Sequence, residues 1–199
     1  MKQTDTDTAA IGLKAKTGRA IAVVLRGPAK SPQVIGRTEL TLTDASVPAT
    51  GQPYHEVMDL PWSEAQVRVR PFIKAIEAAA KQALAQLLSD LEPQGLKVLG
   101  VGITGSADRD LARIGNPHIR AHAAEGVIFR RVLETAADAS GLAKHTFNER
   151  DIEALAAARL EFSVARLNGH LSNLGRPLGP PWRTDHRIAA TAAWLTLLS

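Results

Sequence analysis

The sequence predicts an α/β fold in which a mixed five-stranded sheet is flanked by helices. Three β-prone segments separated by short turns come first, and long helical segments rich in Ala and Leu then alternate with short apolar strands. Hydrophobic residues make up 45% of the 199 residues and charged residues 22%, which is ordinary for a globular protein. We therefore expect residues 1–199 to form a single α/β domain, with the polar residues 1–8 as a flexible N-terminus.

The first three strands are predicted from two apolar runs and one alternating run. Residues 10–13 and 20–25 form a hairpin, joined by a turn over 14–19 in which Gly18 supplies a positive φ angle. A third strand is predicted over residues 33–43, because apolar and polar side chains alternate with period two in residues 39–43, which indicates a strand with one buried face. Strands joined by short turns should pair antiparallel.

A helix and a central strand follow a loop at 44–61. The helix covers residues 62–91, and because Pro71 lacks an amide donor we expect a kink or break near Arg70. Residues 97–104 form a short apolar run typical of a central parallel strand, which a right-handed crossover would place parallel to the first strand. Its glycines fit close packing against a helix better than a phosphate resting on their amides.

The second half of the chain alternates in the same way. We expect a helix from about 117 to 140 that ends at Gly141, and then a last short strand at 144–147. Two further helices are predicted, over 151–167 and 184–198, with a loop at 169–181 between them. Thr184 or Asp185 is the expected N-cap of the second of these helices.

Composition excludes several classes of site. Because the chain has no cysteine, it has no disulfide, no thiolate metal ligand and no cysteine nucleophile. The start lacks the features of a signal peptide, and no apolar stretch reaches about 18 residues, so we expect a cytoplasmic protein with no membrane partner. The net charge of +4 and the pI near 9.7 suit a nucleic-acid partner, although many Arg- and Ala-rich bacterial proteins share such values without binding nucleic acid.

Two local features carry a resemblance to a known family. Residues 11–24 look like a first hairpin with a glycine-containing turn, and residues 185–194 look like a closing helix with an acid at its start and an Ala-rich face. With the element order, they resemble the ribonuclease H-like superfamily, which includes resolvases and shares its core with actin-like ATPases. The resemblance implies a nuclease or a nucleic-acid-binding protein, Mg²⁺ or Mn²⁺ as the only expected cofactor, and Asp185 as a metal ligand.

The same comparison predicts a non-standard or degenerate active site. The family places an aspartate on the first strand, where this chain has Lys14, and an acid at the end of the fourth strand, where it has the stretch 104–106. Ile188 stands where resolvase-type members have a second acid on the last helix. Two hard cations on a phosphodiester need several oxygen ligands, and of the family's set only Asp185 is present.

One further constellation is predicted from helical periodicity. His118, His122 and Glu125 are spaced i, i+4, i+7, so they share one face of the helix that follows the fourth strand. Because the same face becomes apolar further on, we expect it to turn toward the sheet, inside the rim at the carboxyl end of that strand. If the closing helix packs beside this one, Asp185, which the resemblance implies as a metal ligand, and His186 could join the same cleft. The predicted catalytic residues are His118, His122, Glu125 and Asp185, with His122, Glu125 and Asp185 as the metal ligands.

A structural interpretation of the same residues stays open. In it His118 caps the helix, His122 is half-buried, and Glu125 pairs with an arginine such as Arg120 or Arg131. The loop before Trp62 contains His55, Glu56 and Asp59, and these residues could close over a cleft as a lid. We favour the alternative that this segment is an ordinary connecting loop.

Three functions remain. The first is a nuclease or nucleic-acid-binding protein of the ribonuclease H-like type. The second is a non-catalytic protein that binds a partner or a second copy of itself as a homodimer. The third is a metal-dependent hydrolase that uses the His/His/Glu helix face.

Overall fold

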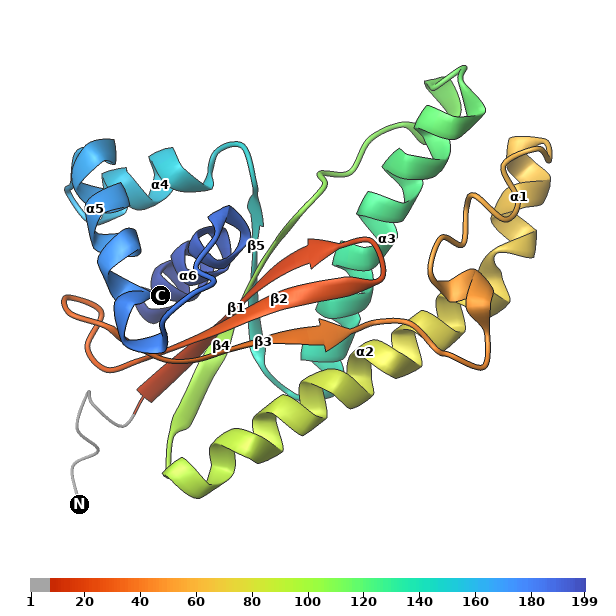
Figure 1. The fold of residues 1–199 in the computed structure, drawn as a ribbon. Coiled ribbons are helices and arrows are strands. Elements are labelled where there is room, and N and C mark those ends of the chain that lie inside the picture. The colour runs from red at the N-terminus through yellow and green to blue at the C-terminus, as the bar shows by residue number, and fades with distance from the viewer. Residues whose placement is uncertain (1–7) are drawn as a thin grey trace.

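A five-stranded mixed sheet forms the centre of the molecule (Figure 1). The computed structural model describes residues 8–199, and the strands lie in the order β3-β2-β1-β4-β5. β1 pairs antiparallel with β2 and parallel with β4, β2 pairs antiparallel with β3, and β4 pairs parallel with β5, which confirms the predicted sheet. The strands are β1 Thr8–Lys16, β2 Arg19–Arg26, β3 Gln33–Thr41, β4 Lys97–Gly105 and β5 Ala143–Asn148.

The first hairpin has a shorter turn than predicted. Lys16 pairs directly with Arg19, so Thr17 and Gly18 alone form the turn, and Gly18 has the expected positive φ of 76°. A two-residue turn of this kind matches the twist of the two strands, and it therefore leaves residues 14–16 in β1. Of the predicted flexible segment 1–8, residues 1–7 lie outside the described part of the chain, and Thr8 begins β1.

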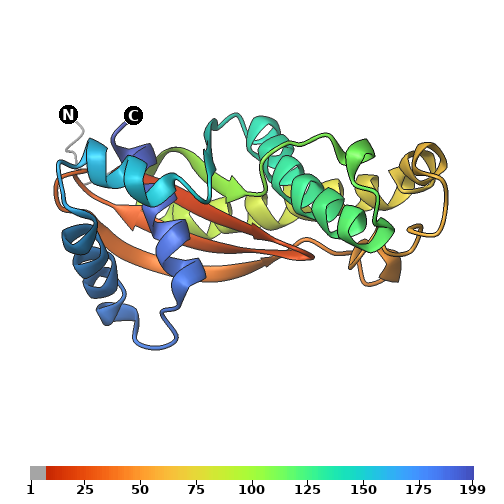
Figure 2. The same cartoon turned by 90° about the horizontal axis from the view of Figure 1, so that it is seen from above.

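Helices cover both faces of the sheet (Figures 1 and 2). α2 and α3 pack on one face, around side chains such as Ile11 and Leu13, and α4, α5 and α6 pack on the other, around Ala10 and Val23. None of the described helices is both long enough and apolar enough to cross a membrane. The helices are α1 Trp62–Arg68, α2 Arg70–Leu91, α3 Pro117–Ala139, α4 Ile152–Arg159, α5 Val164–Leu174 and α6 Thr184–Leu197.

α6 lies directly on the backbone of the two central strands. A Cβ at Gly12 of β1 would lie 2.7 Å from the carbonyl carbon of Ala189 and 2.7 Å from the amide nitrogen of Ala193. A Cβ at Gly102 of β4 would lie 2.7 Å from the carbonyl carbon of Ala192. The favoured explanation of the β4 glycines, close packing against a helix, is therefore confirmed for Gly102.

Three helix boundaries test the sequence predictions. The break expected near Arg70 is confirmed, since α1 ends at Arg68 and α2 begins at Arg70. The helix predicted over 151–167 is wrong, because it is divided into α4 and α5, and α5 continues to Leu174, well into the predicted loop. The Ser163 hydroxyl accepts a hydrogen bond from the amide of Arg166 and so starts a new helix.

The N-cap of α6 is also different from the prediction. Arg183, and neither Thr184 nor Asp185, holds the N-cap position, and its amide donates to Nδ1 of His186 at 3.0 Å. The imidazole of His186 thus accepts a hydrogen bond from the backbone amide of Arg183, one of the amides at the helix start that have no partner within the helix.

A small second assembly, which we call the α3 lobe, stands beyond the sheet. It consists of residues 44–69 and 117–125, and Figures 1 and 2 show α1 and the first turns of α3 extending past the strands. Its apolar cluster contains Tyr54, Val57, Ala65, Val69, Ala121 and Ala124. Ser106, just after β4, lies against Gly126 of α3, so the helical rise places His118 about 12 Å further out.

Candidate metal centre

The first turns of α3 present two histidines on the same side. Asn116 caps the helix, since its Oδ1 accepts a hydrogen bond from the amide of Ile119 at 3.0 Å, and Pro117 occupies the first helical position. His118 is therefore not the cap. Both His118 and His122 are exposed, whereas the sequence placed them inside the rim of the sheet. They differ from that prediction because α3 begins well beyond the end of β4.

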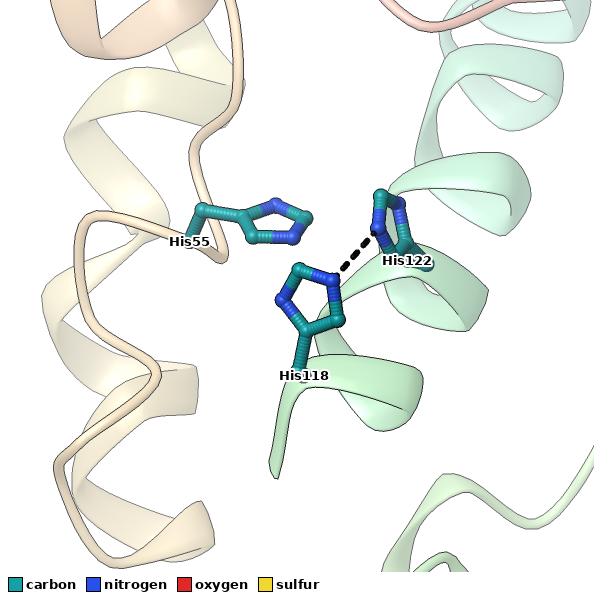
Figure 3. Close-up of side chains that lie close together, drawn as sticks. All are labelled: His55, His118 and His122. Atoms are coloured by element: carbon teal, nitrogen blue, oxygen red, sulfur yellow. Dashed lines mark hydrogen bonds between the residues drawn. The ribbon is translucent and has the colours of Figure 1, made fainter. Parts of the chain in front are cut away.

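A third imidazole comes from the loop 44–61 (Figure 3). The ring of His55 lies with its centroid 5.0 Å from that of His118 and 4.4 Å from that of His122. The Nε2 atoms of His118 and His122 are 3.1 Å apart. One ring nitrogen of each histidine lies within 4.8 Å of the others, so the three side chains present nitrogen atoms to a common point.

Glu125 holds His55 from behind. It is fully buried, and its Oε1 lies 2.8 Å from Nδ1 of His55 and accepts the backbone amides of Tyr54 and His55, each at 3.2 Å. Because Oε1 already accepts two backbone amides, we assign it as the acceptor of the ring as well, which places the ring proton on Nδ1. Nε2 of His55 then carries a lone pair directed away from Glu125, and this atom is buried with no hydrogen-bond partner among the described residues.

Aromatic packing fixes the loop that carries His55. Tyr54 stacks on Trp62 with ring centroids 5.4 Å apart, and the Arg120 guanidinium lies 5.3 Å from the centroid of Trp62. Burial raises the pKa of the Tyr54 hydroxyl above its usual value, and the charge of Arg131 offsets this only in part. Tyr54 therefore stays neutral and acts as a packing residue beside the histidines.

This arrangement has the chemistry of a transition-metal site. Imidazole nitrogens suit Zn²⁺ and similar ions, whereas Mg²⁺ and Ca²⁺ prefer oxygen ligands. A carboxylate that fixes the distal nitrogen of a ligating histidine is the usual supporting contact in such sites, and Glu125 makes that contact. Since His118 and His122 are exposed, three nitrogen ligands would leave the solvent side open for a further ligand.

Three of the four predicted site residues come together, in roles that differ from those expected. His118 and His122 contribute ring nitrogens, and Glu125 lies behind His55 rather than facing the common point or pairing with an arginine. Asp185 is elsewhere, because α6 covers the opposite face of the sheet from α3, and its carboxylate bonds Nζ of Lys16 at 2.7 Å. The predicted ligand set His122, Glu125 and Asp185 is thus not assembled.

The carboxyl ends of β1, β4 and β5 form what we call the sheet outlet, and its residues do not fit the two-metal site that the resemblance implies. Lys14 ion-pairs with Glu149, and Lys16 ion-pairs with Asp185, so each nearby carboxylate already has a cationic partner. Within residues 8–199 the three histidines are the one group with metal-ligand geometry, and no set of three carboxylates converges at the outlet. The ammonium groups would repel a divalent cation there.

Among known proteins, solved structures match this chain, whereas sequence comparisons do not. No protein-family model and no curated protein sequence matches this chain. A structure of Thermus thermophilus RuvC is 10% identical, covers 94% of this chain and 91% of its own, and superposes with a TM-score of 0.52. T. thermophilus RuvC in complex with a Holliday junction substrate is 12% identical over 94% of this chain and 90% of its own, with a TM-score of 0.48. The fold is therefore ribonuclease H-like, as the element order predicts.

Proposed function

We propose that this protein is a metal-dependent hydrolase whose single transition-metal ion is held by His55, His118 and His122. The observation that supports the proposal is the convergence of three ring nitrogens within 4.8 Å, one of them on a ring held by the buried Glu125. Three nitrogen ligands with an open solvent side are typical of catalytic rather than purely structural zinc sites, which use four protein ligands.

The residues divide the work of such a site between them. A bound ion supplies Lewis acidity, which activates water at neutral pH. Glu125 fixes the tautomer and the orientation of His55 through its contact with Nδ1. The exposure of His118 and His122 lets a large substrate approach from solvent without opening the fold.

We propose a phosphodiester in nucleic acid as the substrate class. The net charge of +4 and the pI near 9.7 support a polyanionic substrate. The absence of a fitting carboxylate site at the sheet outlet supports the α3 lobe as the place of the chemistry.

Metal affinity tests the centre first. The purified protein, stripped with EDTA, is titrated with Zn²⁺ and with Mn²⁺ against a chromophoric chelator. We expect one Zn²⁺ per chain. His122→Ala should weaken binding by more than about 100-fold, because loss of supporting contacts alone costs 10–100-fold at such sites. The matched control is His145→Ala on β5, outside the α3 lobe. Equal affinity of the two variants would contradict the proposed ligands.

Hydrolysis is tested on branched, duplex and single-stranded nucleic acids with Zn²⁺ or Mn²⁺. We expect cleavage that is lost in His122→Ala and kept in Asp185→Ala, since Asp185 pairs with Lys16 on the other side of the molecule. If Zn²⁺ binds tightly and no substrate is cleaved, the hydrolase proposal fails and the ion links the loop 44–61 to α3.

A second candidate is a protein that binds nucleic acid without cleaving it. The observation that favours it is the pairing of Lys14 with Glu149 and of Lys16 with Asp185, where the family is expected to have free carboxylates. Binding that is salt-sensitive and independent of metal, with no cleavage under any of the conditions above, would support this candidate over the first.

A further inference from the structure

A pocket of about 400 Å³ lies between the loops that follow β4 and β5. Its polar lining consists of Ser106, Arg109, Asn148, Glu149 and Arg150. We propose that this pocket binds a phosphate group through its side-chain cations, with no metal ion. The pocket is formed by residues outside the α3 lobe, so this proposal does not depend on the proposed metal centre.

The charge of the pocket is positive. Arg109 and Arg150 are exposed, and neither guanidinium has an ion-pair partner among residues 8–199. Glu149 is the one carboxylate in the lining, and it is neutralised by Lys14, whose side chain is only 9% exposed. The guanidinium groups of Arg109 and Arg150 therefore give the pocket a net positive charge.

A neighbouring carboxylate does not cancel this charge. Asp108 is ion-paired with both Arg130 and Arg131. Burial acts to raise the pKa of its carboxyl, but the hydrogen bonds and charges of these two arginines outweigh burial and lower the pKa below its ordinary value. Asp108 thus stays ionised and committed to Arg130 and Arg131, leaving Arg109 free.

Both loops of the pocket are held in place before any ligand arrives. Nε of the buried Arg130 donates to the carbonyl of Ser106 at 2.8 Å. On the other side, Oδ1 of Asn148 accepts the amide of Arg150 at 3.1 Å, and Nδ2 of Asn148 donates to Asp151 at 2.8 Å. A preorganised pocket binds with little loss of loop entropy.

The donors match phosphate chemistry. A guanidinium group presents a planar fork of N–H donors that bonds two phosphate oxygens at once, and the hydroxyl of Ser106 adds a further donor. The ligand is therefore a phosphate, supplied either by a nucleic-acid strand or by a free phosphate compound. At this outlet, arginines would neutralise the charge that metal ions neutralise in a two-metal site.

The test measures binding in EDTA, so that the metal centre plays no part. A short fluorescein-labelled single strand of DNA is titrated with the full-length protein at several salt concentrations, and fluorescence anisotropy is recorded. We expect the double variant Arg109→Ala/Arg150→Ala to lose at least about 10-fold in affinity. It should also reduce the slope of log affinity against log salt by about 1.4, which corresponds to two phosphate contacts on a single strand.

The matched control removes the same charge elsewhere. Lys74→Ala/Lys81→Ala changes two exposed cations on α2 and should bind nearly as the wild type does. Because Arg109 and Arg150 are exposed, the melting temperature of their double variant should match that of the wild type.

Competition identifies the source of the phosphate. Displacement of the labelled strand by inorganic phosphate or pyrophosphate supports a site for a free phosphate compound, and displacement by unlabelled DNA alone supports a site for a strand. The proposal is overturned if the wild type binds none of these probes. It is also overturned if the arginine double variant binds as tightly as the lysine double variant.

Discussion

The sheet outlet and the α3 lobe differ in whether their polar side chains have partners within the protein. At the outlet the two lysines of β1 each have an anion, with Lys14 bonded to Glu149 and Lys16 to Asp185. In the α3 lobe three histidines face one another, and the carboxylate that accompanies them lies behind one ring. These two lysines and their carboxylates satisfy each other, while Nε2 of His55 has no protein partner within the described chain. A side chain left without a partner is the better indicator of a ligand.

The two regions also differ in how they are packed. The outlet belongs to a sheet on which α6 lies in direct backbone contact, whereas the α3 lobe depends on a small apolar cluster and on the hydrogen bonds of Glu125. Substitutions in the sheet should therefore change the stability of the whole fold. Substitutions in the α3 lobe should change metal binding with little effect on the fold.

The largest effect is expected from Gly12→Ala. The added Cβ would meet backbone atoms of Ala189 and Ala193 at 2.7 Å, which cannot move without shifting α6, so we expect a loss of about 3 kcal/mol or more in the free energy of unfolding. Gly36→Ala on β3 is the control, since nothing lies within 4 Å of its Cβ position. Urea denaturation measures both variants. Equal losses would show that α6 does not lie as closely on β1 as described.

The next largest effect is a difference in Zn²⁺ affinity between substitutions of Glu125 in the α3 lobe and Glu149 at the outlet. Glu125→Gln keeps the shape of the side chain but removes the charge behind His55, so Zn²⁺ affinity should fall by about 10–100-fold. Glu149→Gln, at the outlet, should leave Zn²⁺ affinity unchanged. The chelator competition assay measures both. A larger loss from Glu149→Gln than from Glu125→Gln would reverse the comparison between the two regions.

Local sequence signals predicted most of the fold. The alternation in the strands, the glycine at the first turn and the proline after Arg70 each act over a few residues, and the structure has the corresponding strands, turn and helix break. The division of 151–167 into two helices was missed because helix-forming residues lie on both sides of Ser163, and its hydroxyl decides the boundary.

The candidate site was predicted only in part, for a reason of geometry. Helical periodicity brings His118, His122 and Glu125 to one face without any tertiary information. His55 reaches them from the loop 44–61, whose position depends on the packing of Tyr54 against Trp62. One signal was available in the sequence: a carboxylate on the inward face of a helix needs donors, and His55 was a candidate donor in the loop before α1.

Asp185 illustrates the opposite error. Its position at the start of the last helix resembles the family pattern, but a cleft shared with His118 and His122 required α3 and α6 to lie on one face of the sheet. They cover opposite faces, and Lys16 at the end of β1 is the nearest charged partner of Asp185. Because no strand follows α6, the handedness rule for crossovers does not determine which face of the sheet this helix covers.

The smallest effect concerns pH and again distinguishes the outlet side from the α3 lobe. Burial lowers the pKa of His186 below its ordinary value of 6.5, the charges of Arg37 and Arg183 lower it further, and Asp185 opposes them. The folded state therefore binds fewer protons than the unfolded state, so the stability from neutral His186 is present above pH 6.5 and is lost as the pH falls toward the folded pKa.

His186→Gln should remove this part of the pH dependence. Because the ring is partly exposed and solvent screens its neighbours, we expect the variant to change the pH-dependent loss of stability by less than about 1 kcal/mol. Urea midpoints of both proteins are compared at about pH 5 and about pH 8, a range that spans the ordinary histidine pKa. The difference between the two proteins isolates His186, since all other histidines are common to both. A wild type that becomes more stable than the variant on acidification would contradict the lowered pKa.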